Sequence, residues 1–182
     1  MSTQAIGAAA AGTAVIGGGG TLVAYAAGAF DLKEKDWQQA TFEEYAQSLG
    51  LKYVGVTGNT SLGELPDKEK IKKKIEDNSK GAQYRAILKK HWGNMENKDV
   101  IEVNKPTRPE EEEGVLFPSD STTRTKDSEV ADWTKSWCKA AKDISNKIKR
   151  AKGEGWEWNT DLLNKNNKWK AFEEVCFETK EG

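Results

Sequence analysis

The first thirty residues, Met1 to Phe30, contain no charged side chain, whereas all 28 Lys and Arg and all 29 Asp and Glu residues follow them. A helix of about 20 apolar residues crosses the hydrocarbon core of a bilayer. The stretch from Ala5 to Phe30 is 26 residues long, so its length is sufficient. This division predicts a membrane-directed segment, residues 1–30, in front of a body that stays in water.

Three interpretations of residues 1–30 are open, because alanine and glycine dominate the segment and strongly apolar residues are few. We favour a retained anchor, or uncleaved signal, over a cleaved signal peptide, since the basic n-region of a secretory signal is missing. Small residues at 24–29 nevertheless offer cleavage sites. The third interpretation is a flexible tail. Lys33 and Lys35 favour a cytoplasmic body by the positive-inside rule, but two lysines leave the orientation open.

The body that follows is very polar. The whole chain has a mean hydropathy of −0.77 despite its apolar start, so seven tryptophans must supply much of any core. Its net charge is −1. A nucleic-acid-binding surface normally needs a clustered basic excess, so nucleic acid is not an expected partner.

The N-terminal half of the body predicts short helices. Residues 41–44, Thr-Phe-Glu-Glu, have the spacing of a capping box and predict a helix that Gly50 ends. Residues 51–56 alternate roughly and predict a short strand, and turn residues fill 57–66. Residues 68–92 predict a helix with an interruption at Gly81.

The C-terminal half begins after a predicted linker, residues 104–127. Three prolines and four consecutive glutamates, Glu110 to Glu113, indicate a stretch that buries too little surface to become ordered. An amphipathic helix is predicted over 128–152 and a last helix over 161–178. We therefore expect a mainly α fold with minor β structure, in which an N-terminal membrane helix precedes two lobes, residues 31–103 and 128–182.

The two cysteines, Cys138 and Cys176, each lie on the apolar side of a predicted helix. Cys138 follows Trp137, and Cys176 lies four residues after Phe172. Two cysteines that face one core can meet, so we expect a disulfide, with two buried reduced thiols as the alternative. A disulfide requires an oxidising compartment, which links this expectation to an outward-facing body.

No pattern of residues predicts catalysis, a cofactor or a metal site. His91 is the only histidine, and it has no ligand spacing with either cysteine. We therefore expect a protein that is not an enzyme. Trp156 and Trp158 lie in a predicted glycine-flanked turn and are candidates for a contact surface for a sugar or a partner protein. We favour the other interpretation, in which they fold back over the core.

The layout as a whole resembles a known group of proteins. An uncharged Gly/Ala-rich start is followed by Ile87-Leu88 before Trp92, a variable acidic stretch, Trp137-Cys138 and a tryptophan-rich end. This order is similar to that of the paralogous families of small proteins in haemotropic mycoplasmas, wall-less bacteria that live on red blood cells. The resemblance implies a membrane-anchored protein displayed outward, with host contact or antigenic variation as its role. It implies no catalytic residue.

The leading hypothesis is therefore a non-enzymatic, single-pass surface protein in the cell membrane. Its expected partners are the lipid bilayer and a host-cell surface protein or glycan. The alternatives are a cytoplasm-facing membrane scaffold, in which both cysteines would be reduced, and a tryptophan-based binding module. The sequence does not indicate an oligomeric state.

Overall fold

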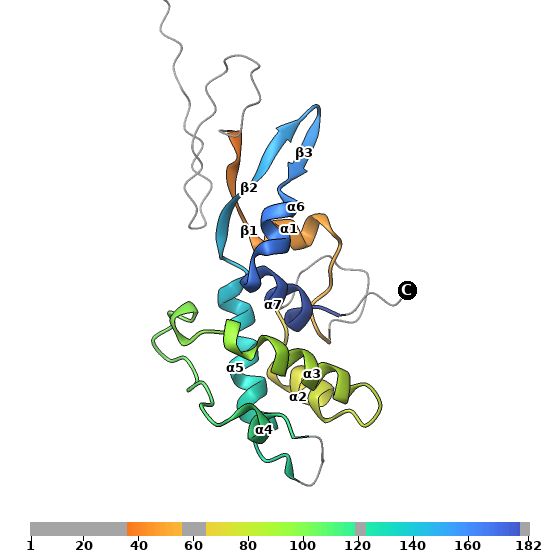
Figure 1. Ribbon diagram of the computed structural model, residues 1–182, viewed down its shortest axis with the longest axis vertical. Helices are drawn as coiled ribbons and strands as arrows, with labels where there is room; N and C mark the ends of the chain where they lie inside the picture. Colours follow the sequence, from red (N-terminus) through yellow and green to blue (C-terminus); the bar gives the residue numbers. More distant parts are fainter. Residues whose placement is uncertain (1–35, 56–64, 119–122, 179–182) are drawn as a thin grey trace, which may run out of the picture. The chain divides into compact units, whose positions relative to one another are not determined.

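The computed structural model describes residues 36–55, 65–118 and 123–178 (Figure 1). The predictions for residues 1–30 and for most of the turn at 57–66 lie outside these residues. From Trp37 onward the described residues belong to one compact unit. Helices outnumber strands, as the mainly α prediction requires, and the elements follow in this order: β1 (Gln38–Thr41), α1 (Phe42–Ser48), α2 (Lys68–Glu76), α3 (Gly81–His91), η2 (Trp92–Asn94), η3 (Asn97–Asp99), α4 (Glu113–Leu116), α5 (Asp127–Ala141), β2 (Ser145–Lys152), β3 (Gly155–Trp158), α6 (Thr160–Lys165) and α7 (Asn167–Cys176).

Helix α1 begins and ends where the sequence predicts. The Thr41 hydroxyl accepts a hydrogen bond from the Glu44 N–H at 3.1 Å and caps the helix start. Gly50, with φ of 64°, takes the left-handed conformation that ends the helix. The strand predicted after it is not formed by residues 51–55. Tyr53 instead makes one isolated antiparallel bridge to Phe177.

The predicted helix over 128–152 is wrong after Ala141, where α5 ends and strand β2 follows. The four-residue spacing of Ile144 and Ile148 fits a helix, but a central strand has hydrogen-bonding partners on both sides. β2 pairs antiparallel with β1 on one edge and with β3 on the other, in the order β1-β2-β3. Gly153, with φ of 60°, allows the tight β2–β3 turn.

The interruption predicted at Gly81 is confirmed, and its cause is local. After α2, the Asp77 carboxylate accepts hydrogen bonds from the N–H groups of Ser79 and Lys80, both at 2.7 Å. These bonds fold residues 77–80 into a turn, and α3 begins at Gly81. A side-chain turn of this kind offers the backbone an alternative to continuing the helix.

Replacing Gly81 with alanine is expected to destabilise the fold by about 1–3 kcal/mol, the usual cost of overpacking. A Cβ at this position would lie 2.7 Å from the Ile75 carbonyl oxygen and 3.0 Å from that of Lys74, and backbone atoms cannot move aside cheaply. Urea denaturation followed by circular dichroism measures the change. Gly114→Ala is the matched control, because its Cβ meets nothing within 4 Å. Equal stability of the two variants would contradict the expected clash.

Asp77→Ala is expected to lower the melting temperature at neutral pH and to have less effect in acid. Hydrogen bonds, above all from the Lys80 N–H, lower the pKa of Asp77 to about 2 from its ordinary 3.8. A carboxylate with a lowered folded-state pKa stabilises the fold above the ordinary value, and this contribution is lost as the pH falls through about 2. The difference in melting temperature between the two proteins should therefore narrow as the pH falls from 6 to 2.5. A constant difference would show that Asp77 acts without its charge.

The predicted linker, residues 104–127, is anchored to the core on both sides of an exposed stretch, residues 110–115, so the prediction that it stays unpacked is wrong. The Arg108 guanidinium lies 4.9 Å from the Trp92 ring centroid and donates hydrogen bonds to the Trp92 and Met95 carbonyl oxygens. Leu116 and Phe117 are buried, and Phe117 contacts Trp92 edge-on. A few apolar side chains are enough to attach this segment to the core, because Arg108 also donates hydrogen bonds to carbonyl groups at the end of a helix.

The two predicted lobes consequently share one core in the described residues. α2 from the first half packs on α5 from the second, and α3 and α5 both pack on α7. Trp133, Trp137 and Trp169 are almost completely buried in this core. The predicted last helix is in fact two helices, because the Asn166 side chain caps the start of α7 by accepting hydrogen bonds from two backbone N–H groups.

Candidate functional site

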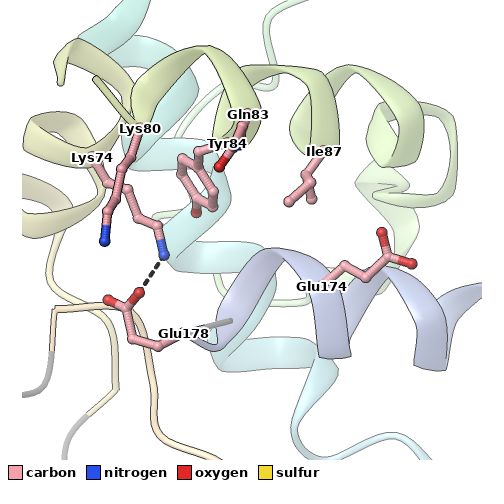
Figure 2. A pocket seen from close by; sticks show the side chains of 7 residues that line it. All are labelled: Lys74, Lys80, Gln83, Tyr84, Ile87, Glu174 and Glu178. Atoms are coloured by element: carbon pink, nitrogen blue, oxygen red, sulfur yellow. Dashed lines mark hydrogen bonds and ion pairs between the residues drawn. The ribbon is translucent and has the colours of Figure 1, made fainter. Parts of the chain in front are cut away.

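A cavity of about 270 Å³ opens between α3 and α7 (Figure 2). Its lining comes from α2, the α2–α3 turn, α3, α7 and the residues after α7, and consists of Lys74, Lys80, Gln83, Tyr84, Ile87, Glu174 and Glu178. Two of the lining residues, Lys74 and Glu178, form an ion pair of 2.5 Å. The Glu178 carboxylate also accepts a hydrogen bond from the Gly55 N–H at 2.7 Å.

Glu174 and Tyr84, two other polar residues of the cavity, also have partners within the protein. Burial opposes ionisation of Glu174, but hydrogen bonds from Lys90 and His91 leave its pKa below the ordinary value. Burial raises the pKa of the Tyr84 hydroxyl, which donates a hydrogen bond to the Val175 carbonyl oxygen at 2.9 Å. Tyr84 is thus a neutral structural donor. The cavity alone does not indicate a class of ligand.

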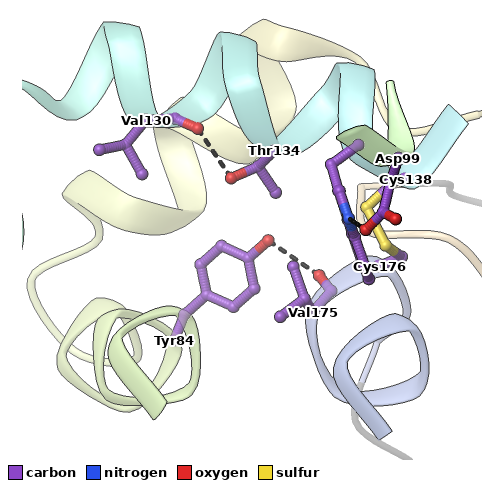
Figure 3. The surroundings of a disulfide bond; sticks show 8 residues. Tyr84, Asp99, Val130, Thr134, Cys138, Val175 and Cys176 are labelled. Carbon is purple, nitrogen blue, oxygen red and sulfur yellow. Dashed lines mark hydrogen bonds between the residues drawn. A yellow bond between two sulfur atoms is a disulfide. The ribbon is translucent and has the colours of Figure 1, made fainter. Parts of the chain in front are cut away.

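The two cysteines lie opposite each other at disulfide distance (Figure 3). Cys138 is on α5 and Cys176 is the last residue of α7, with 5.8 Å between their Cα atoms. Both side chains are fully buried. The apolar spacing in the sequence therefore predicted correctly which helix faces meet. A bond between these two residues links α5 to α7.

Ordered polar contacts surround the cysteine pair. Asp99, in η3, accepts a hydrogen bond from the Trp137 indole N–H at 3.1 Å and pairs with the Lys168 ammonium group. Because Trp137 precedes Cys138 on α5 and Lys168 is on α7, Asp99 connects the same two helices as the cysteine pair does. The pair is therefore in a rigid, packed environment from which solvent is excluded.

Trp156 and Trp158 lie on strand β3, whereas the sequence predicted them in a turn. Trp158 is partly buried, and its ring centroid lies 5.1 Å from that of Tyr45. Trp156 is 53% exposed. The sequence left two interpretations of these tryptophans, and each fits one residue. Trp158 folds back over the core, whereas Trp156 is available for contact.

A lysine lies against both indole rings. The Lys149 ammonium nitrogen is 4.3 Å from the Trp156 ring centroid and 5.4 Å from that of Trp158. It also pairs with Glu44 at 3.3 Å. Lys149 and Trp158 are register partners in the β2–β3 ladder, so the sheet itself places the cation beside the aromatic rings.

His91 is buried, with its Nε2 atom 3.1 Å from the Glu174 carboxylate. Within the described residues, no group of three or more His, Cys, Asp or Glu side chains is arranged to hold a metal ion. The same part of the chain contains no helix with both the length and the apolarity needed to cross a bilayer. The predicted anchor, residues 1–30, lies outside the part of the chain that the structure describes.

Sequence reasoning missed the cavity and the three-stranded sheet. Lys74 and Glu178 are 104 residues apart, and no local pattern connects them. For the sheet a signal does exist: Lys-Gly-Glu-Gly at 152–155 is a turn signal between two segments that could be strands. In the comparisons with known proteins, the chain matches no protein-family model, no curated protein and no solved structure.

Proposed function

We propose that the chain is a non-enzymatic, single-pass membrane protein that displays a small α-rich domain on the outer face of the cell membrane. The observation that carries the proposal is the buried Cys138–Cys176 pair at disulfide distance. Disulfides persist in oxidising compartments and are rare in the cytosol. The pair therefore supports an external domain, and the uncharged stretch at residues 1–30 supports its attachment to a membrane.

The resemblance to the haemotropic mycoplasma families extends this proposal to a role. We assign the domain to contact with a host-cell surface protein or glycan, or to antigenic variation.

Surface biotinylation of intact cells, combined with a thiol assay, tests the proposal. The outward-displayed protein should be labelled without permeabilisation. Because both cysteines are buried, the thiol assay is done in denaturant, where a maleimide reagent should react with them only after reduction. The alternative favoured by Lys33 and Lys35, a cytoplasm-facing scaffold, predicts labelling only in permeabilised cells and free thiols without reduction. That second result would overturn the proposal. Recovery of the uncleaved chain in the soluble fraction would overturn membrane attachment in either orientation.

A further inference from the structure

One end of the sheet combines exposed tryptophan with basic side chains. We call this end the sheet tip and define it by Trp37, Lys149, Arg150, Lys152 and Trp156. Residues 151–156 are all exposed, and the β2–β3 hairpin extends away from helices α2 and α3 (Figure 1). None of the contacts described for the cavity or the cysteine pair involves the sheet tip.

The chain also enters the folded unit at the sheet tip. β1 runs antiparallel to β2, and its first residue, Gln38, is the register partner of Lys149, which in turn is paired with Trp158. The residue before β1, Trp37, stacks on Arg150 with 4.5 Å between the guanidinium carbon and the ring centroid. The start of β1 and the β2–β3 turn therefore lie at the same end of the sheet.

The length of chain before Trp37 limits how far this end can be from the apolar segment. Six residues, 31–36, separate Phe30 from Trp37 in the sequence, which makes seven steps from one to the other. A fully extended chain spans at most about 3.6 Å per residue, so the connection reaches no further than about 25 Å. If residues 1–30 are held in a bilayer, the sheet tip is the part of the folded unit that must lie near its surface.

The chemistry of the sheet tip fits the headgroup region of a bilayer. Tryptophan is enriched at the membrane–water interface, where its apolar ring and polar N–H group are both accommodated. Lysine and arginine extend their charges toward phosphate groups while their carbon stems cover apolar surface. At the sheet tip each type is held beside the other, with Lys149 against Trp156 and Arg150 against Trp37. Glu157 pairs with Arg150 and Lys152. Glu44 pairs with Lys149, so three basic side chains face two carboxylates.

We propose that the sheet tip rests in the phospholipid headgroup region of the bilayer that holds residues 1–30. Trp156 enters the headgroup layer, and lipid phosphates add to the carboxylate partners of the basic side chains, with the exposed Lys152 foremost. This contact fixes one orientation of the folded unit on the membrane and turns α2 and α3 toward the solvent. The inference rests on the membrane attachment in the proposed function, but it holds for either orientation of the protein.

The experiment uses the full-length chain in nanodiscs of phosphatidylcholine and phosphatidylglycerol, with a spin label on a fraction of the headgroups. The label should quench a component of the tryptophan emission in the unsubstituted protein, and this component should be absent from Trp156→Phe. Lys152→Glu should weaken the quenching, since each basic side chain near anionic headgroups favours contact by about five-fold. Lys73→Glu, an exposed residue of α2, is the matched control and should quench like the unsubstituted protein.

The outcomes separate this inference from the proposed function. If the chain does not co-elute with the nanodiscs, membrane attachment fails and the inference fails with it. If the chain co-elutes but Trp156 contributes nothing to the quenching, only the inference is overturned. Quenching of equal strength in Lys152→Glu and Lys73→Glu would also overturn it. If quenching of Trp156 decreases as the number of chains per disc rises, the sheet tip contacts a second copy of the chain, and the lipid contact is overturned.

Discussion

Reduction of the Cys138–Cys176 bond is expected to lower the free energy of unfolding by about 3–4 kcal/mol, as the chain-entropy model gives for a closed loop of this size. The two residues are 38 apart in the sequence, so the bond removes many conformations from the unfolded chain. Such a loss is a large part of the 5–15 kcal/mol that usually stabilises a domain. Guanidinium denaturation of the oxidised protein, with and without reductant, measures it.

The double variant Cys138→Ala/Cys176→Ala controls for other effects of the reductant. It should unfold near the midpoint of the reduced protein and should not respond to reductant at all. Both side chains are fully buried, so the alanines add a modest packing loss of their own. An unchanged midpoint of the unsubstituted protein on reduction would contradict the stabilising role of the bond and would weaken the argument for an oxidising compartment.

Trp169→Ala is expected to destabilise the fold by about 3–5 kcal/mol, the usual cost of removing a buried tryptophan side chain. Trp169 is 1% exposed. Its ring lies 4.8 Å from Tyr45 and 5.4 Å from Phe42, both on α1, and 6.0 Å from Phe172 on its own helix. Its removal therefore leaves a cavity between α1 and α7 and loses several aromatic contacts. Thermal denaturation followed by far-ultraviolet circular dichroism detects the change without relying on tryptophan emission.

Trp156→Ala is the matched control for Trp169→Ala, because it deletes the same side chain from an exposed position. It loses mainly the contact with Lys149, and cation–π contacts at exposed sites contribute about 0.5–1 kcal/mol. Trp169→Phe should fall between the two, since a phenylalanine ring refills part of the cavity. A similar loss of stability in Trp156→Ala and Trp169→Ala would mean that Trp169 is not the core contact between α1 and α7.

The features that the sequence predicted correctly depend on neighbours along the chain. The Thr41 cap of α1 involves residues three apart, and the turn before Gly81 depends on Asp77 and the three residues that follow it. The approach of Cys138 to Cys176 followed from apolar residues repeated at helical spacing on two separate segments. Each of these signals is local, so a single sequence contains it.

The features that were predicted wrongly depend on partners far along the chain. Ile144 and Ile148 are equally compatible with a helix and a strand, and the choice is made by β1, which precedes β2 by about a hundred residues. The stretch around the Glu110–Glu113 run was expected to stay outside the core. The contacts that order it are those of Arg108 and Phe117 with Trp92, which lies earlier in the chain. The cavity could not be predicted for the same reason, because its lining residues come from segments that are far apart in the sequence.

The pairing of β1 with β2 also determines the order of events while the protein is being made. β1 leaves the ribosome early, but its partner residues, Ser145 to Lys149, are translated about a hundred residues later. The β2–β3 hairpin is local, and hairpins form within microseconds. We therefore expect the hairpin to form first and β1 to pair with β2 afterwards. Until that moment β1, a short polar segment, is hydrogen-bonded to water, so the three-stranded sheet is completed late in synthesis.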